Sequence, residues 1–192
     1  MSSVHFRQDS SFLYFSGVNE PNAAVLILEN GYSILFLPTP TKDDPLWHGP
    51  TPSFAEKQKH YGVDEVTGIT TLPEYKLPPN TVSIAVPDLQ KNMLLTDLLK
   101  QKYVFGTHFG DSDLVDAIIS MRRQKDEWEV LQLQKAAAMS AQAHIAVMQA
   151  TRAGAHEREL AALFQGMLLA RGCPLGYPTI LTVQGQVLHQ FH

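Results

Sequence analysis

The stretch "AAVLILENGYSILFLP", Ala23 to Pro38, decides the fold of the first half of this chain. It holds two apolar runs that meet at Asn30-Gly31, the dipeptide that best tolerates a positive φ in a tight hairpin turn. The pattern therefore predicts two strands joined at that turn, and these strands form a sheet.

The segments on either side are predicted from the same kind of pattern. Before the hairpin, "SFLYFSG" (residues 11–17) is expected to be a further strand. After it, residues 38–52 contain five prolines, which cannot donate to a ladder, so a long ordered loop or an edge excursion is expected to carry Trp47. A short helix should then run from Thr51-Pro52, an N-cap with a proline at the first helical position, to near Gly62.

The pattern of strands and helices continues beyond this helix. "TVSIAVP" (residues 81–87) is predicted as a buried strand, and "YVFG" (residues 103–106) is a candidate for another. An amphipathic helix between them has leucines at helical spacing, namely Leu94, Leu95, Leu98 and Leu99. This alternation predicts an α/β layer over roughly the first 110 residues.

The second part of the chain begins near Gly110 and consists almost entirely of helix-forming residues. Asp126 followed by Glu129 has the spacing of a capping box, which predicts the start of a helix. This helix is rich in alanine, so another element can approach it closely. We expect it to run to about Thr151 and to be closed by Gly154.

A second helix is predicted at about residues 157–171, with an apolar stripe that must be buried and with Gly172 as its C′ residue. "YPTILTVQGQVLHQF" (residues 177–191) then predicts two strands around Gln184-Gly185. Two strands alone are marginal in water, so this second domain is expected to be incomplete, with an unpaired strand edge.

The composition is that of an ordinary globular protein, with 192 residues, of which 44% are hydrophobic and 18% charged. A formal net charge of −4 argues against a nucleic-acid partner. The single cysteine, Cys173, excludes an internal disulfide framework and fits a reducing compartment. No apolar run approaches the roughly 20 residues of a membrane span, and the start lacks a secretory signal, so we expect a cytoplasmic location without membrane contact.

Several common catalytic motifs are absent from the sequence, including a Gly-rich phosphate loop, a G-x-S-x-G elbow and a paired-cysteine zinc site. "HEREL" (residues 156–160) has half of the H-E-x-x-H zinc pattern, but a helix cap also explains it. His108 lies near Asp111 and Asp113, which a Gly- and Asp-rich turn explains without a metal. Trp47 is either a core aromatic or a contact for a substrate or partner.

Several phrases, in their order along the chain, resemble the aminopeptidase P and prolidase group of metallopeptidases, whose catalytic domain has the fold called pita bread. "FRQDSSFLYFSGVNEPNAAVLIL" resembles the signature of the N-terminal domain, with Gly17, Glu20 and Pro21. "LWHGP" is similar to the Trp-x-Gly motif, and "VLHQF" to the Leu-His-Tyr motif. The resemblance implies an α/β N-terminal domain at residues 1–112, followed by the opening helices and hairpin of an incomplete pita-bread domain at residues 113–192.

The resemblance also implies a chemistry. In this family two divalent metal ions, usually manganese, activate a hydroxide that attacks the carbonyl before a proline, so proline-containing peptides are the expected substrates. By position, His189 resembles the motif histidine that contacts the substrate without binding metal. Tyr177 resembles the tyrosine that lines the pocket for the substrate's N-terminal residue. Trp47 resembles a tryptophan that reaches the active site of a neighbouring subunit, which implies a homodimer or homotetramer.

The family's metal ligands are two Asp, one His and two Glu, all C-terminal to the Leu-His-Tyr motif, and this sequence ends three residues after His189. We therefore expect no metal ligand within these residues, a chain cut at both ends, and no activity of the chain alone. The expected parent is an Xaa-Pro aminopeptidase. A prolidase, or a non-catalytic interaction module with the same fold, is the alternative.

Overall fold

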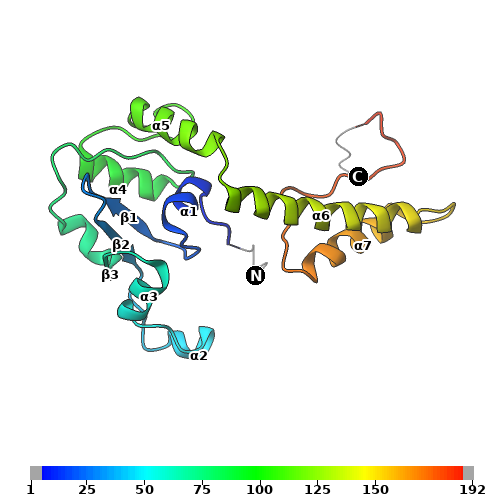
Figure 1. The fold of residues 1–192 in the computed structure, drawn as a ribbon, viewed down its shortest axis with the longest axis horizontal. Helices are drawn as coiled ribbons and strands as arrows, with labels where there is room; N and C mark the ends of the chain where they lie inside the picture. Colours follow the sequence, from blue (N-terminus) through cyan, green and yellow to red (C-terminus); the bar gives the residue numbers. More distant parts are fainter. Residues whose placement is uncertain (1–5, 188–192) are drawn as a thin grey trace. The chain divides into compact units, whose positions relative to one another are not determined.

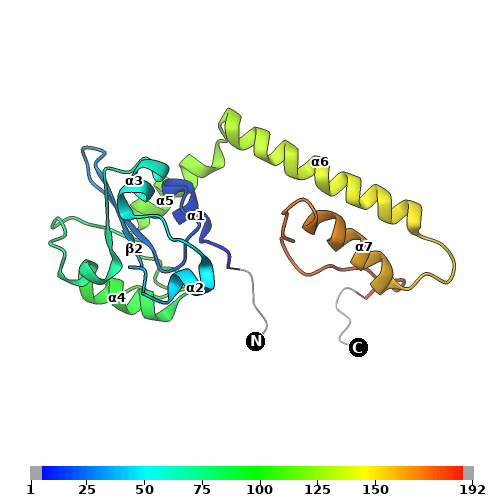
Figure 2. The same ribbon diagram turned by 90° about the horizontal axis from the view of Figure 1, so that it is seen from below.

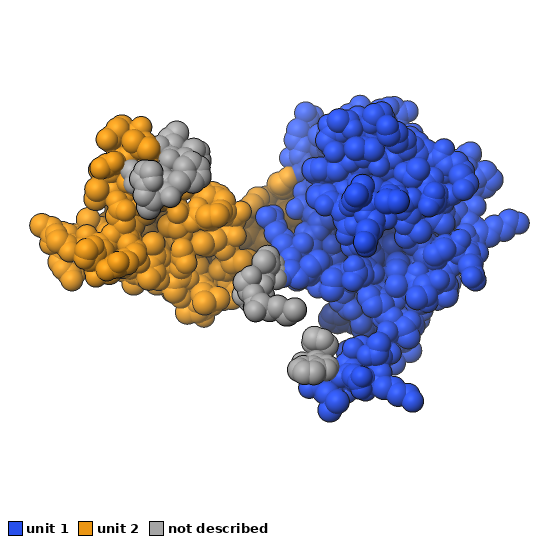
Figure 3. Space-filling view, turned by 180° about the vertical axis from the view of Figure 1, so that it is seen from behind, with its two compact units in different colours: residues 1–123 blue, residues 124–192 orange. Residues whose placement is uncertain are grey.

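The computed structural model describes residues 6–187, without the side chains of Trp47 and His48. The chain divides into two compact units, residues 1–123 and residues 124–192, which Figure 3 colours separately. Each unit is described by itself. The element labels are those of Figure 1.

The first unit is built on a sheet of three strands in the order β1-β2-β3. β1 (Ala24–Ile27) pairs antiparallel with β2 (Ser33–Leu37), and β2 pairs parallel with β3 (Glu65–Gly68). The predicted hairpin is thus confirmed, whereas β3 was not predicted. The mixed sheet with helices confirms the α/β fold class.

The hairpin loop is one residue longer than a two-residue turn. The Leu28 N–H donates to the Tyr32 carbonyl, and the Gly31 N–H donates to the Leu28 carbonyl. Gly31 alone in this loop has a positive φ, of 85°. This is the arrangement of a three-residue hairpin loop, in which a turn is followed by a left-handed glycine.

β2 is the centre of the core because both of its faces are covered. Leu35 and Leu37 pack on one face with Val18 and with side chains from α1 (Ser10–Ser16) and α3 (Phe54–Tyr61). Ile34 and Phe36 pack on the other face with Leu72. The partly buried residues on that second face are Ala24, Leu26, Ile69, Tyr75, Leu94 and Leu98. All four apolar residues of β2 are at most 1% exposed, which explains the uninterrupted apolar run in the sequence.

The predicted strand at residues 11–17 is wrong, because this segment is the helix α1. The Asp9 carboxylate accepts hydrogen bonds from the N–H groups of Ser11 and Phe12 at 2.9 and 3.0 Å and so caps the helix. Gly17 ends it in the left-handed conformation with a φ of 65°. The aromatic and β-favouring composition of the segment was overridden by these two end signals.

The proline-rich segment after β2 contains a short helix, α2 (Asp44–His48), which includes the backbone of Trp47. α3 follows it and ends at Gly62, as predicted. Its N-cap is Ser53 and not Thr51. Ser53 forms a capping box with Glu56, because the Glu56 carboxylate accepts from the Ser53 N–H at 2.8 Å and the Ser53 hydroxyl accepts from the Glu56 N–H at 3.3 Å.

β3 leads into a 3₁₀ helix, η1 (Ile69–Glu74), and later into α4 (Leu89–Leu99), which confirms the predicted leucine-rich helix. The strand predicted at residues 81–87 is wrong, since only Ile84 forms an isolated bridge. The buried Asn92 side chain satisfies the backbone here, because its amide accepts from the Val86 N–H at 2.9 Å and donates to the Val86 carbonyl at 2.7 Å. The Asn92 side chain therefore satisfies the backbone of Val86, while the Ala85 N–H donates to the Phe109 carbonyl at 2.8 Å.

The candidate strand at residues 103–106 is likewise only a single bridge between Val104 and His108, which exchange backbone hydrogen bonds across a tight turn. The turn interpretation of His108 is thus confirmed. α5 (Ser112–Arg123) closes the first unit. The Arg122 guanidinium donates to the Ser11 hydroxyl at 2.9 Å, which joins α5 to α1.

The second unit contains α6 (Glu127–Ala150) and α7 (Glu157–Leu169), which lie side by side as an antiparallel pair (Figure 2). The capping box of Asp126 and Glu129 is present as predicted, but α6 ends at Thr151, before Gly154. The fully buried Ala143 shows how a small side chain permits close approach to α7. His156 is the N-cap residue of α7, so the helix-cap interpretation of "HEREL" is confirmed.

The end of α7 has the hydrogen bonds of a Schellman motif. The Cys173 N–H donates to the Leu168 carbonyl at 3.0 Å, and the Gly172 N–H donates to the Leu169 carbonyl at 2.9 Å. Gly172, with a φ of 68°, is therefore the C′ residue that was predicted. The predicted C-terminal hairpin is not seen in its described part, because no strand forms between residues 174 and 187.

Candidate functional site

A partly buried polar cluster in the first unit is built around Glu20, in the loop between α1 and β1. Its Oε2 accepts a hydrogen bond from Lys57 Nζ at 2.6 Å, and its Oε1 accepts one from the Tyr61 hydroxyl at 2.8 Å. The Glu20 carbonyl accepts from Gln8 Nε2 at 2.8 Å. Lys57 and Tyr61 lie one helical turn apart on α3, so the same face of the helix presents both donors.

The ion pair between Lys57 and Glu20 is largely buried. The Lys57 side chain is 9% exposed and the Glu20 side chain 29%, so the ion pair is largely removed from water. Desolvation, followed by the hydrogen bond to Glu20 and its negative charge, raises the pKa of Tyr61 to about 12. Tyr61 therefore stays a neutral hydrogen-bond donor at physiological pH. The cluster fixes the loop that contains Glu20 against α3.

The helix that carries Lys57 and Tyr61 follows the segment that contains Trp47. α3 begins at Phe54, a few residues after the helix α2 that contains Trp47. A second carboxylate stabilises the start of α2, because Asp44 accepts hydrogen bonds from the Thr41 N–H at 2.7 Å and the Thr41 hydroxyl at 2.8 Å.

In the second unit, Tyr177 lies in the segment that follows α7, residues 174–187, and it is 72% exposed. Two side chains of α7 bind this segment. Gln165 Nε2 donates to Thr179 Oγ1 at 2.8 Å, and Glu157 Oε1 accepts from the Val183 N–H at 2.6 Å. Tyr177 therefore projects from a segment that is anchored on α7.

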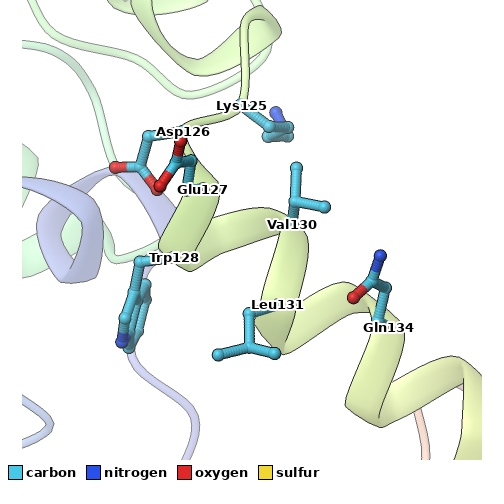
Figure 4. A pocket seen from close by; sticks show the side chains of 7 residues that line it. All are labelled: Lys125, Asp126, Glu127, Trp128, Val130, Leu131 and Gln134. Carbon is cyan, nitrogen blue, oxygen red and sulfur yellow. The ribbon is translucent and has the colours of Figure 1, made fainter.

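An open surface hollow of about 520 Å³ lies at the start of α6. Its lining consists of Lys125, Asp126, Glu127, Trp128, Val130, Leu131 and Gln134. Figure 4 shows these side chains spreading outward around one helix, and they do not converge on a common point. A binding site normally needs a few convergent polar groups, so we assign no chemistry to this hollow.

The described part of the chain holds no group of three or more His, Cys, Asp or Glu side chains that could bind a metal ion. His189 lies outside the described residues. Trp47 belongs to the first unit and Tyr177 to the second. The phrase that resembles the family signature includes Glu20. Its partners Lys57 and Tyr61 are not identified from the sequence, although their i, i+4 spacing on a predicted helix indicates a shared face.

Comparisons with known proteins assign the chain to a family. Residues 2–79 match the aminopeptidase P N-terminal domain. The probable Xaa-Pro aminopeptidase pepP of Aspergillus niger is 33% identical over 175 residues, which are 88% of this chain and 36% of that protein. The chain belongs to the aminopeptidase P family. A probable Xaa-Pro aminopeptidase of Metarhizium robertsii is 34% identical over 94% of this chain and 39% of its own length.

Solved structures agree with this aminopeptidase P assignment at the level of the fold. The low-pH form of Escherichia coli aminopeptidase P superposes with a TM-score of 0.71 at 21% identity, over 87% of this chain and 41% of that one. The same enzyme with the inhibitor Pro-Leu gives the same values. The chain therefore spans less than half the length of the curated and solved relatives that it matches. None of its described helices is long and apolar enough to cross a membrane.

Proposed function

We propose that these residues belong to a metal-dependent aminopeptidase that releases the N-terminal residue from peptides with proline in the second position. The observation that supports this most strongly is that relatives over 30% identical across about nine-tenths of this chain are named as probable Xaa-Pro aminopeptidases. The fold agrees with it over both units, since the superposition on E. coli aminopeptidase P covers 87% of the chain.

In this proposal the catalytic metals are held by residues outside the described part of the chain. Two divalent ions, which we propose to be manganese, would lower the pKa of a bound water and stabilise the tetrahedral oxyanion. The described residues do not fit such a centre, because they contain no suitable cluster of ligands. We therefore propose that the 192-residue chain alone hydrolyses nothing.

The contribution of this chain is to bind and orient the substrate. We propose that Tyr177 lines the pocket for the substrate's N-terminal residue, a role that its 72% exposure leaves open. His189 would contact the substrate and help to handle the proton or the oxyanion. Trp47 would contact a neighbouring subunit's site in a homodimer or homotetramer.

Further parts of the proposal concern organisation and location. We place the family's domain limits at residues 1–112 and 113–192, and the protein in the cytoplasm. Limited proteolysis with mass spectrometry tests the domain limits, because cleavage near residue 112 would support them, whereas cleavage near residue 124, where the two compact units divide, would assign α5 to the first domain. Sedimentation of the longer product, with and without Trp47→Ala, tests the oligomer.

The deciding experiment compares this chain with the longest product of its own gene. Both are assayed for bound metal and for cleavage of an Xaa-Pro-Xaa tripeptide, an Xaa-Pro dipeptide and a matched Xaa-Ala tripeptide. We expect the longer product alone to bind two metals and to cleave the Xaa-Pro tripeptide. Cleavage of the dipeptide alone would instead identify a prolidase, and no metal and no cleavage by either protein would favour a non-catalytic binding role.

A further inference from the structure

The segment after α7 is bound to that helix at two points with matched spacing. Gln165 and Glu157 are eight residues apart on α7, which corresponds to about 12 Å along a helix. Their partners Thr179 and Val183 are four residues apart, which corresponds to about 13 Å of extended chain. The segment therefore runs extended and antiparallel along α7, in one defined register.

The two contacts leave the outer side of the segment open. Tyr177, Ile180 and Val183 are 72%, 58% and 86% exposed, so most of their apolar surface is open while polar groups hold the segment to the helix. Beyond Val183 the chain turns, because the Val187 N–H donates to the Gln184 carbonyl at 2.9 Å. Tyr177 lies between the end of α7, where the Cys173 N–H donates to the Leu168 carbonyl, and the contact at Thr179, and the contact at Val183 fixes the register beyond it.

We propose that Gln165 and Glu157 are positioning residues, which fix the register of residues 174–187 on α7 and thereby place Tyr177 for substrate binding. This inference rests on the proposed peptidase function. Gln165 acts through the Thr179 hydroxyl, and Glu157 acts through the Val183 backbone. Neither residue touches the substrate. A register shift would displace Tyr177 without unfolding the helix pair.

The contacts themselves are tested on the 192-residue chain by amide hydrogen exchange of Val183, followed by NMR. Glu157→Ala should speed this exchange about tenfold, because a charge-assisted hydrogen bond is lost. Glu157→Gln keeps an acceptor oxygen at the same reach and should stay within about threefold of the wild type. The matched control is Glu127→Ala, which removes an exposed first-turn acid from α6 and should leave Val183 exchange unchanged.

The functional role is tested in the longer gene product. Gln165→Ala should raise KM for the Xaa-Pro tripeptide about fivefold and leave kcat within about twofold. The variant loses one neutral hydrogen bond that positions the binding pocket, and the reacting groups are unchanged. Thr179→Val should do the same, and the double variant should be no worse than either single one. Gln165→Glu should restore KM, because the Thr179 hydroxyl can donate to the new carboxylate. Gln149→Ala, an exposed glutamine on α6, is the control.

The outcomes distinguish a failure of the contact, a failure of the positioning role and a failure of the proposed function. Unchanged Val183 exchange in Glu157→Ala would overturn the contact and with it the proposal. Faster exchange with an unchanged KM in Gln165→Ala and Thr179→Val would overturn the positioning role alone. A wild-type longer product that cleaves no Xaa-Pro peptide would overturn the proposed function, while the exchange experiment would still decide the register of the segment.

Discussion

Lys57 Nζ lies 2.6 Å from Glu20 Oε2, a contact between residues 37 positions apart in the sequence. The other oxygen of Glu20 accepts the Tyr61 hydroxyl, so both carboxylate oxygens are bound by one face of α3. In the phrase that resembles the family signature, Glu20 thus has a structural reason to be a carboxylate. It joins the loop before β1 to the helix that follows the proline-rich segment.

Breaking this ion pair should destabilise the first unit. Lys57→Met leaves the half-buried Glu20 charge with the Tyr61 hydroxyl as its remaining partner on α3, so we expect a loss of about 2 kcal/mol in the free energy of unfolding. The matched control is Lys91→Met, which breaks the exposed Lys91–Asp88 pair at 3.9 Å and should cost less than about 0.5 kcal/mol. Equal losses in the two variants would contradict the structural role of the buried pair.

These measurements need a signal that reports the first unit. The chain has two tryptophans, Trp47 in the first unit and Trp128 in the second. Trp128 is 68% exposed, so Trp128→Phe should be tolerated. Any change in tryptophan fluorescence during urea unfolding in that background then arises from the first unit, and circular dichroism of the same samples reports the whole chain.

The Tyr61 hydroxyl should make stability depend on alkaline pH. Burial and Glu20 raise the pKa of Tyr61 from 10.0 to about 12, so the folded state holds this proton more tightly than the unfolded state. The resulting stabilisation is fully present below pH 10 and is lost as the pH rises to about 12. Wild type should be about 1 kcal/mol more stable than Tyr61→Phe at pH 9, and this difference should shrink above pH 10 and be gone before the pH reaches about 12. A constant difference over this range would contradict the assignment.

Asn92 should be the most sensitive polar residue of α4. It is 4% exposed and makes both of its hydrogen bonds with the backbone of Val86. Asn92→Ala leaves a backbone donor and acceptor unpaired in a partly buried site and should cost about 2 to 3 kcal/mol in unfolding free energy. Asn80→Ala, in an exposed turn, should change stability by less than about 0.5 kcal/mol. A similarly small effect at Asn92 would show that water replaces the side chain.

His189 provides a test of the proposed chemistry in the longer gene product. We expect His189→Ala to lower kcat about 100-fold or more while the bound metal, measured by plasma mass spectrometry, stays at the wild-type level. The reason is that the proposed role is a contact with the substrate and not metal ligation. Loss of metal in this variant would mean that His189 is a ligand and that its role is wrongly assigned.

Patterns that depend on neighbours in the sequence were predicted well. The hairpin around Asn30-Gly31, the capping box of Asp126 and Glu129, and the C′ glycine Gly172 are each decided by residues a few positions apart. Their hydrogen bonds close locally, so the sequence alone is sufficient. The family was also correctly inferred from phrases in the sequence.

The wrong predictions concern segments whose residues are compatible with a strand and also with another structure. Residues 11–17 are rich in aromatic residues, yet the Asp9 cap and Gly17 make them a helix. Residues 81–87 have the composition of a strand, yet only Ile84 forms a bridge, and the Asn92 side chain takes both backbone groups of Val86. The composition could not distinguish these cases, because the deciding partner is a single polar side chain.

The sequence by itself determined the central apolar strand, the N-cap of α6, the C′ glycine of α7 and the family of this chain, since all of these depend on short-range patterns. Only the tertiary structure decided that β3 joins β2, that Lys57 and Tyr61 meet Glu20, and that Gln165 and Glu157 set the register of the segment with Tyr177. The physical reason is that these contacts join residues separated by 14 to 41 positions, and only a folded core brings such residues within hydrogen-bonding distance.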